Sequence, residues 1–168
     1  MPSVRLLARF LADAQSAVRL SGQVTVLLTS DAAIRRMNRR FRGKDKATDV
    51  LSFPAADFTQ VSRTRRGAPA KEIAGDLAIS VPTARRQAAE RDHSLATEIK
   101  VLILHGLLHL AGYDHESDSG QMSRKERQLR ARLDLPQGLI ERSLEPRTRR
   151  TSRSRKPASG NAGKAARS

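Results

Sequence analysis

The chain of 168 residues contains no cysteine, no tryptophan and only five aromatic residues, four Phe and one Tyr. Without cysteine, disulfide frameworks, thiolate nucleophiles and cysteine-based zinc fingers are excluded, so a transition metal would need His, Asp or Glu ligands. No apolar run approaches the roughly 18 residues of a membrane span. Arg9 and Asp13 interrupt the one N-terminal apolar stretch that resembles a signal peptide. We therefore expect a cytoplasmic protein with no membrane partner.

Acidic residues are also scarce, since 17 Asp and Glu stand against 32 Lys and Arg and leave a net charge of +15. Residues 146–168 hold eight basic residues, no acid and almost nothing apolar to bury. We expect a single domain over residues 1–145 and a disordered basic tail over 146–168. The excess charge indicates a polyanionic partner. For the tail itself, a solvated appendage and an RNA contact are both open.

Hydrophobic periodicity over residues 1–145 predicts three strands among five helices, which indicates an α/β or α+β domain with a small mixed sheet. The basic segment from Ala55 to Lys71 lacks periodicity and is predicted as a long loop. The predicted strands cover residues 23–29, 49–54 and 73–81. The predicted helices are one over the first twenty residues ending at Gly22, one capped by Ser30 or Asp31, one with Pro82 in its first turn, one from a Ser94 cap to Gly112, and one over about 118–133. The second helix is predicted to direct Ile34, Met37 and Phe41 inward, and the last helix Met122, Leu129 and Leu133.

Three of the four histidines fall within one short segment, His105 to His115, with the sequence HGLLHLAGYDH. His105 and His109 are four residues apart on a predicted helix and therefore project from one face. Gly112 can turn the chain so that His115 supplies a third nitrogen. Three imidazoles with an open fourth position are typical of catalytic zinc, where bound water is acidified. We predict one metal ion here, Zn²⁺ or another divalent transition metal, and a cap or surface position for His93.

The spacing of these histidines matches the metzincin pattern H-E-x-x-H-x-x-G-x-x-H, except that Gly106 occupies the position of the glutamate. That glutamate is the general base of peptide hydrolysis, so a metallopeptidase is disfavoured and would need a base from elsewhere in the chain. Phosphodiester cleavage needs an activated water or hydroxyl and cations that offset oxygen charge, which a metal and an arginine supply. Asp114 either orients an imidazole or the metal's water, or is a plain turn residue.

Three segments together resemble the YbeY family of rRNA-maturation endoribonucleases: His105 to His115, Phe41 to Pro54 (FRGKDKATDVLSFP) and Ala74 to Ser80 (AGDLAIS). The resemblance covers about residues 20–135. It implies a compact, zincin-like α+β fold and a zinc-dependent, single-strand-specific endoribonuclease that matures the 3′ end of small-subunit (16S) rRNA and acts in ribosome quality control. It also implies a ribosomal protein and a ribosome-assembly GTPase as partners on the small ribosomal subunit.

The same resemblance implies zinc ligands at His105, His109 and His115, and a role for Arg42 in holding the scissile phosphate. The expected catalytic set is therefore Arg42, a zinc-bound water and Asp114, with Lys44 and Lys46 adding positive potential for RNA. Because most aromatic residues occupy expected core positions, we expect RNA to be held through phosphates rather than through stacked bases. A ribosome-assembly binding factor with a structural zinc is the alternative from a different functional class.

Overall fold

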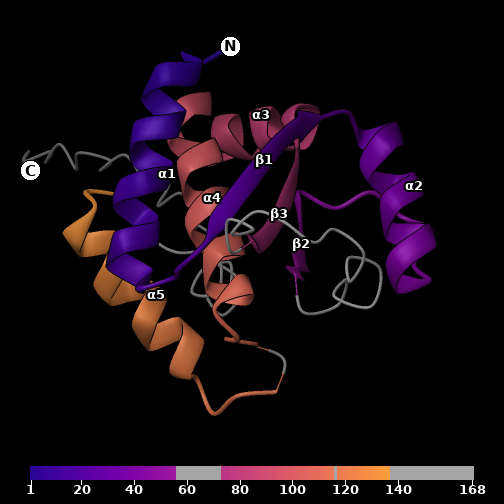
Figure 1. The fold of residues 1–168 in the computed structure, drawn as a ribbon. Helices are drawn as coiled ribbons and strands as arrows, with labels where there is room; N and C mark the ends of the chain where they lie inside the picture. Colours follow the sequence, from indigo (N-terminus) through magenta and orange to yellow (C-terminus); the bar gives the residue numbers. More distant parts are fainter. Residues whose placement is uncertain (56–72, 116, 137–168) are drawn as a thin grey trace, which may run out of the picture.

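The computed structural model describes residues 1–55, 73–115 and 117–136 (Figure 1). The predicted basic loop, apart from its first residue, and the predicted tail lie outside these described residues. Within them the chain forms an α+β fold, as expected from the sequence. Its elements are α1 (Val4–Val18), β1 (Gln23–Thr29), α2 (Asp31–Arg42), β2 (Val50–Pro54), β3 (Ile73–Ser80), α3 (Val81–Glu90), α4 (Leu95–Leu110) and α5 (Gln121–Arg132).

The sheet has the strand order β1-β3-β2, so β3 lies at its centre. β3 pairs in parallel with β1 and antiparallel with β2, which makes the sheet mixed. Side chains alternate along β3: Leu77 and Ile79 join the main core with α1 and α4, while Ala78 packs with Ile34 of α2 on the other face. α2 thus covers one face of the sheet, and α4 covers the other (Figure 1).

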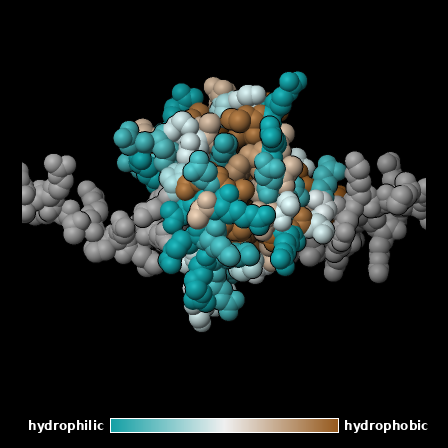
Figure 2. Space-filling model, turned by 90° about the vertical axis from the view of Figure 1, so that its left-hand side faces the viewer, coloured by the Kyte–Doolittle hydropathy of each residue, from teal (hydrophilic) through white to brown (hydrophobic). Residues whose placement is uncertain are grey.

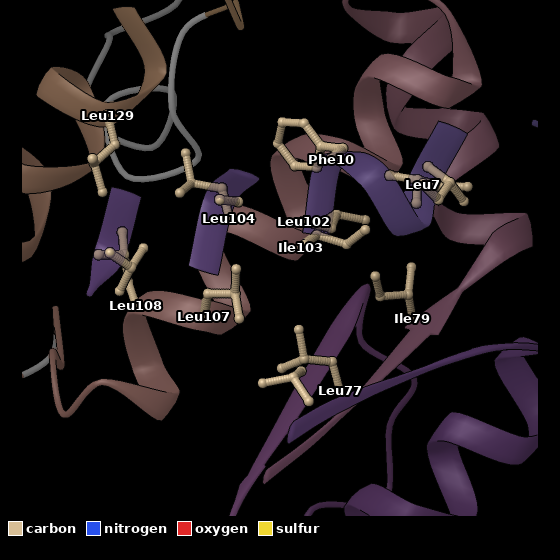
Figure 3. Close-up of a cluster of buried hydrophobic side chains, with 14 of the residues drawn as sticks. Leu7, Phe10, Leu77, Ile79, Leu102, Ile103, Leu104, Leu107, Leu108 and Leu129 are labelled. Carbon is tan, nitrogen blue, oxygen red and sulfur yellow. The ribbon is translucent and has the colours of Figure 1, made fainter. Parts of the chain in front are cut away.

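α4 is the centre of the main core, and nearly all of its residues from Glu98 to Leu108 are buried. Figure 3 shows its leucines and Ile103 meeting Leu7 and Phe10 of α1, Leu77 and Ile79 of β3, and Leu129 of α5. On the side of α1 and α5, hydrophilic residues surround a group of hydrophobic residues near the middle of the face (Figure 2). No helix of the described residues combines the length and the apolar character needed to cross a bilayer.

Serine side chains cap three helices. The sequence predicts Ser94, and Ser30 or Asp31, as caps, whereas it places Ser80 and Val81 in the strand over 73–81; in the structure Ser80 is a cap and Val81 begins α3. The hydroxyls of Ser30, Ser80 and Ser94 accept the backbone N–H three residues ahead, and Pro82 lies in the first turn of α3. Two helix ends come earlier than predicted. α1 ends at Val18 because Arg19 adopts a left-handed conformation and closes the last turn, and α4 ends at Leu110, two residues before Gly112.

One predicted core residue is wrong: Phe41 is 50% exposed, whereas Ile34 on the same helix is fully buried. The core under α2 consists of Ile34, Leu51 and Ala78, and it ends where Met37 and Phe53 pack against it. Phe41 belongs to the last turn of α2, beyond that small core. Its ring meets Phe53 edge to face, with 5.3 Å between the ring centroids and 73° between the planes.

Candidate active site

The three predicted histidine ligands come together at the C-terminal end of α4. Each offers a ring nitrogen, and these atoms all lie within 4.8 Å of one another. The Nε2 atoms of His105 and His109 are 3.2 Å apart. The ring of His115 lies with its centroid 5.6 Å from that of His105 and 5.3 Å from that of His109. The fold therefore assembles a three-nitrogen cluster from one helix and the turn that follows it.

Gly112 makes that turn. Its φ of 90° lies in the left-handed region that side chains other than glycine rarely adopt. Around it, the N–H of Gly112 donates to the carbonyl of His109 and the N–H of Tyr113 donates to that of Leu108, both at 3.0 Å. This closure reverses the chain after α4 and brings His115 back to the two helical histidines.

Gly106 explains why the glutamate of the metzincin pattern is absent. A Cβ on Gly106 would lie 2.7 Å from Cδ2 of Leu77 and 3.3 Å from Oγ of Ser52. The same Ser52 hydroxyl donates to the carbonyl of Gly106 at 3.3 Å. α4 thus packs directly on the sheet at this position, and a glutamate side chain has no room there. The structural reason supports the sequence argument against peptide hydrolysis by that base.

Glu126 of α5 is a site residue that the sequence interpretation missed. It is only 2% exposed, and its Oε2 lies 3.3 Å from Nδ1 of His105. With Nδ1 facing the carboxylate, His105 turns Nε2 toward His109, which is the arrangement that orients metal-binding imidazoles. A signal was present in the sequence: Glu126 is four residues after Met122 and three before Leu129, so it shares their inward face.

The pKa of His109 is lowered to about 4. Burial of the ring is the main cause, and repulsion from His105, His115 and Arg42 adds to it, while Asp114 opposes it. His109 is therefore neutral at pH 7, which is the form that donates a lone pair to a metal. Three imidazoles, one of them backed by a buried carboxylate, form a donor set that fits a divalent transition metal such as Zn²⁺.

A pocket of about 470 Å³ opens beside this cluster. Arg42, the last residue of α2, lies in its wall, and its Nη2 donates to the carbonyl of Ser52 at 3.4 Å. The structure thus brings Arg42 and His109, which are 67 residues apart in sequence (109 − 42), to one pocket. The full lining is Phe41, Arg42, Ser52, Phe53, Pro54, His109, Gly112, Tyr113 and Asp114.

Asp114 is a turn residue that also lines the pocket. Its Oδ2 accepts the hydroxyl of Ser117 at 2.8 Å, and its carbonyl accepts the N–H groups of Ser117 and Asp118, so it does organise a turn. Its carboxylate also lines the pocket and acts electrostatically on His109. The predicted turn role of Asp114 is thus present, and its role toward an imidazole or a metal-bound water stays a prediction.

The remaining sequence candidates lie elsewhere. Lys44 and Lys46 are exposed, and neither is among the described residues that line the pocket of Arg42 and His109. Lys46 lines a second pocket of about 430 Å³ with Asp31, Arg35 and Asp45. His93, expected as a cap or surface residue, packs just before α4 against the buried carboxylate of Glu98, outside the histidine cluster.

Comparison with known proteins gives one consistent family. The family model described as endoribonuclease YbeY matches residues 4–134. A protein named endoribonuclease YbeY from Koribacter versatilis is 49% identical to the chain, over 86% of this chain and 86% of that protein. One of the same name from Helicobacter pylori is 39% identical, over 83% of this chain and 89% of that protein. A solution structure from Thermotoga maritima is 26% identical, with a TM-score of 0.49, and the match covers 79% of this chain and 85% of that one.

Proposed function

The chain belongs to the YbeY endoribonuclease family, and we propose that it is a metal-dependent, single-strand-specific endoribonuclease that matures the 3′ end of small-subunit (16S) rRNA. The observation that carries the proposal is the pocket whose wall contains both Arg42 and His109. It places a guanidinium, which suits a phosphate, beside a three-histidine cluster, which suits a metal. The net charge of +15 favours a polyanionic substrate of this kind.

Each residue has a distinct task in this proposal. A metal ion held by His105, His109 and His115, with Zn²⁺ our assignment, would supply Lewis acidity for the attack on phosphorus. Arg42 has five N–H donors in a fixed fork, so the guanidinium held at Ser52 can also grip two oxygens of the scissile phosphate. Asp114 accepts a hydrogen bond from the attacking water or hydroxyl.

The proposed setting follows from the substrate. We place the reaction in the cytoplasm, on the small ribosomal subunit, with a ribosomal protein and a ribosome-assembly GTPase as partners and a further role in ribosome quality control. Lys44 and Lys46 contribute positive potential on the exposed turn after α2. A metallopeptidase is disfavoured because the packing around Gly106 leaves no room for its general base.

The test is cleavage of ribosomal RNA by the wild type and three variants, with metal content and helicity measured on each preparation. We expect His109→Ala to lose both metal and cleavage. Arg42→Ala should keep its metal and lose about 100-fold in rate, the usual cost of removing one charge-stabilising donor. Arg5→Ala, which removes an exposed arginine of α1, is the control for lost charge. Equal cleavage by all four proteins would reveal a contaminant and reject the proposal.

A binding factor with a structural metal predicts a different outcome for the same variants. His105→Ala would then unfold the protein, and Arg42→Ala would change affinity for RNA without changing any cleavage rate. Truncation before residue 146 separates binding from cleavage, because it removes eight positive charges. We expect the truncated protein to bind RNA more weakly and with a smaller salt dependence, while the rate at saturating RNA stays nearly unchanged. Loss of metal on truncation would contradict this division.

A further inference from the structure

An exposed aromatic ring stands at the pocket that holds Arg42. Phe41 is 50% exposed and lines that pocket together with Arg42 and His109. Leu27 on β1 is similarly exposed, at 51%, but is not among the described residues of the pocket wall. The exposure of Phe41 therefore coincides with the candidate active site, whereas that of Leu27 does not.

The ring of Phe41 is held in place by its surroundings. Phe53 of β2 packs against it edge to face at 5.3 Å, and the guanidinium carbon of Arg40 lies 5.4 Å from its centroid. Phe41 is also part of α2 rather than of a loop, so its backbone is fixed by the helix. A ring that is positioned in this way and still half exposed offers a flat apolar surface next to a phosphate-binding guanidinium.

We propose that Phe41 is a nucleobase subsite, on which the base of a nucleotide adjoining the phosphate held by Arg42 stacks. The proposal rests on the proposed function, because it takes RNA to be the occupant of the pocket. Every base has a π-face, so the stacking accepts all four bases and is sequence-tolerant. The pocket of about 470 Å³ lies within the range of about 300–1,000 Å³ that is usual for ligand sites.

This subsite also gives a physical reason for selecting single strands. A base inside a duplex is already stacked on both faces and must leave the helix before it can reach a protein ring, whereas an unpaired base is free to do so. Phosphate contacts through Arg42 do not make that distinction, because both forms of RNA carry phosphates. The proposal adds one base contact, at Phe41, to the phosphate contacts that the sequence predicts.

A fluorescence experiment tests the subsite without any cleavage. The chain has no tryptophan, so Phe41→Trp introduces a single reporter into the full-length protein, and Leu27→Trp is the matched control. We titrate each metal-free variant with single-stranded RNA and with an abasic oligonucleotide of the same length. Quenching of the Phe41→Trp variant by the RNA alone supports the subsite. Equal quenching by the abasic strand, or equal quenching of the Leu27→Trp variant, overturns it.

Binding and cleavage measurements with smaller side chains complete the test. Phe41→Ala and Phe41→Leu should each bind single-stranded RNA about 5- to 150-fold more weakly, the loss expected for one stacked base, while Phe41→Tyr should bind like the wild type. On the abasic strand, all four proteins should bind alike. Equal RNA binding by the leucine variant and the wild type overturns the stacking role. If the wild type binds in this way but cleaves nothing, the proposed function fails and the subsite stands.

Discussion

The two ends of α4 each hold a histidine against a buried glutamate, yet they are built differently. At the N-terminal end, Nε2 of His93 contacts Glu98, and Nη1 of Arg91 donates to the same carboxylate at 3.1 Å. At the C-terminal end, Nδ1 of His105 faces Glu126, and its Nε2 turns toward His109. At the first end Nε2 of the histidine contacts the glutamate, and at the second end Nε2 points toward the other histidines of the cluster.

The difference teaches that a buried histidine–glutamate pair does not by itself mark a functional site. Glu98 contacts His93 and Arg91, which are five and seven residues away in sequence, so this cluster ties the end of α3 to the start of α4. Glu126 comes from α5 and is 21 residues from His105. The informative feature is which ring nitrogen of the histidine contacts the carboxylate, because that contact decides whether the other nitrogen points toward a site where a metal could bind.

Breaking the cluster at the start of α4 should give the largest loss of stability. Glu98 is fully buried, and Glu98→Ala leaves the guanidinium of Arg91 and the ring of His93 without the carboxylate that both contact. Removing one partner of a buried ion pair costs about 3–5 kcal/mol. Since Arg91 is partly exposed and can turn to water, we expect about 3 kcal/mol at pH 7, measured by urea unfolding of the metal-free protein.

Glu98→Gln is the milder companion variant, because it keeps a hydrogen-bond acceptor and should lose less stability than Glu98→Ala. Both variants should bind zinc as the wild type does at temperatures where they are folded. A fall in zinc affinity in folded Glu98→Gln would contradict the assignment of this end of α4 to structure alone.

The ligand cluster was predictable from the sequence because its determinants are local. Helical spacing places His105 and His109 on one face, and a glycine at position 112 signals the turn that returns His115. Two serine caps were equally predictable, since Ser30 and Ser94 directly precede their helices. Each of these predictions depends on residues fewer than about ten positions apart.

The parts that failed or were missed depend on how elements pack in three dimensions. Phe41 has the spacing of an inward residue, but α2 extends past the small core under it, and no local pattern reports where that core stops. Glu126 was missed because a carboxylate on a charged helix is expected to face solvent. Only the packing of α5 on α4 explains its burial and its contact with His105.

Disturbing the C-terminal end of α4 should change metal affinity rather than stability. Glu126→Gln keeps the shape of the side chain but removes the negative charge facing Nδ1 of His105. Loss of such an outer partner typically weakens metal binding about 10- to 100-fold. We expect that loss for zinc in competition with a chromophoric chelator. The midpoint of thermal unfolding of the metal-free variant should equal or exceed that of the wild type, because a buried charge has been removed.

Two results would contradict the assignment of a structural role to Glu98 and a metal-orienting role to Glu126. Unchanged zinc affinity in Glu126→Gln would show that the carboxylate does not orient His105 as a ligand. A loss of stability in metal-free Glu126→Gln as large as that in Glu98→Ala would show that both glutamates serve structure. Measuring Glu98→Gln and Glu126→Gln under the same conditions separates the two cases.

Asp31 is a third carboxylate to compare with Glu98 and Glu126, because it is only partly buried. Asp31 begins α2 and accepts hydrogen bonds from the hydroxyls of Ser80 and Thr83 and from Arg86. These bonds, led by that of Ser80, lower the pKa of Asp31 to about 2 from 3.8. A lowered pKa in the folded state means stability that is present above pH 3.8 and is lost as the pH falls toward 2.

Substituting Asp31 should have a smaller effect than substituting Glu98 or Glu126. The side chain of Asp31 is 35% exposed, so solvent screens it, and we expect about 1 kcal/mol rather than the full value of the pKa shift. Asp31→Asn should therefore reduce the fall in unfolding free energy between pH 4 and pH 2 by about that amount. The free energy is measured by urea unfolding at each pH. Asp13→Asn, at an exposed site on α1, is the control and should keep the wild-type slope. If the unfolding free energies of the wild type and Asp31→Asn fall equally with pH, the hydroxyl contacts stabilise the protonated and ionised forms of Asp31 alike. The energetic effects of Glu98, Glu126 and Asp31 would then not follow how deeply each carboxylate is buried.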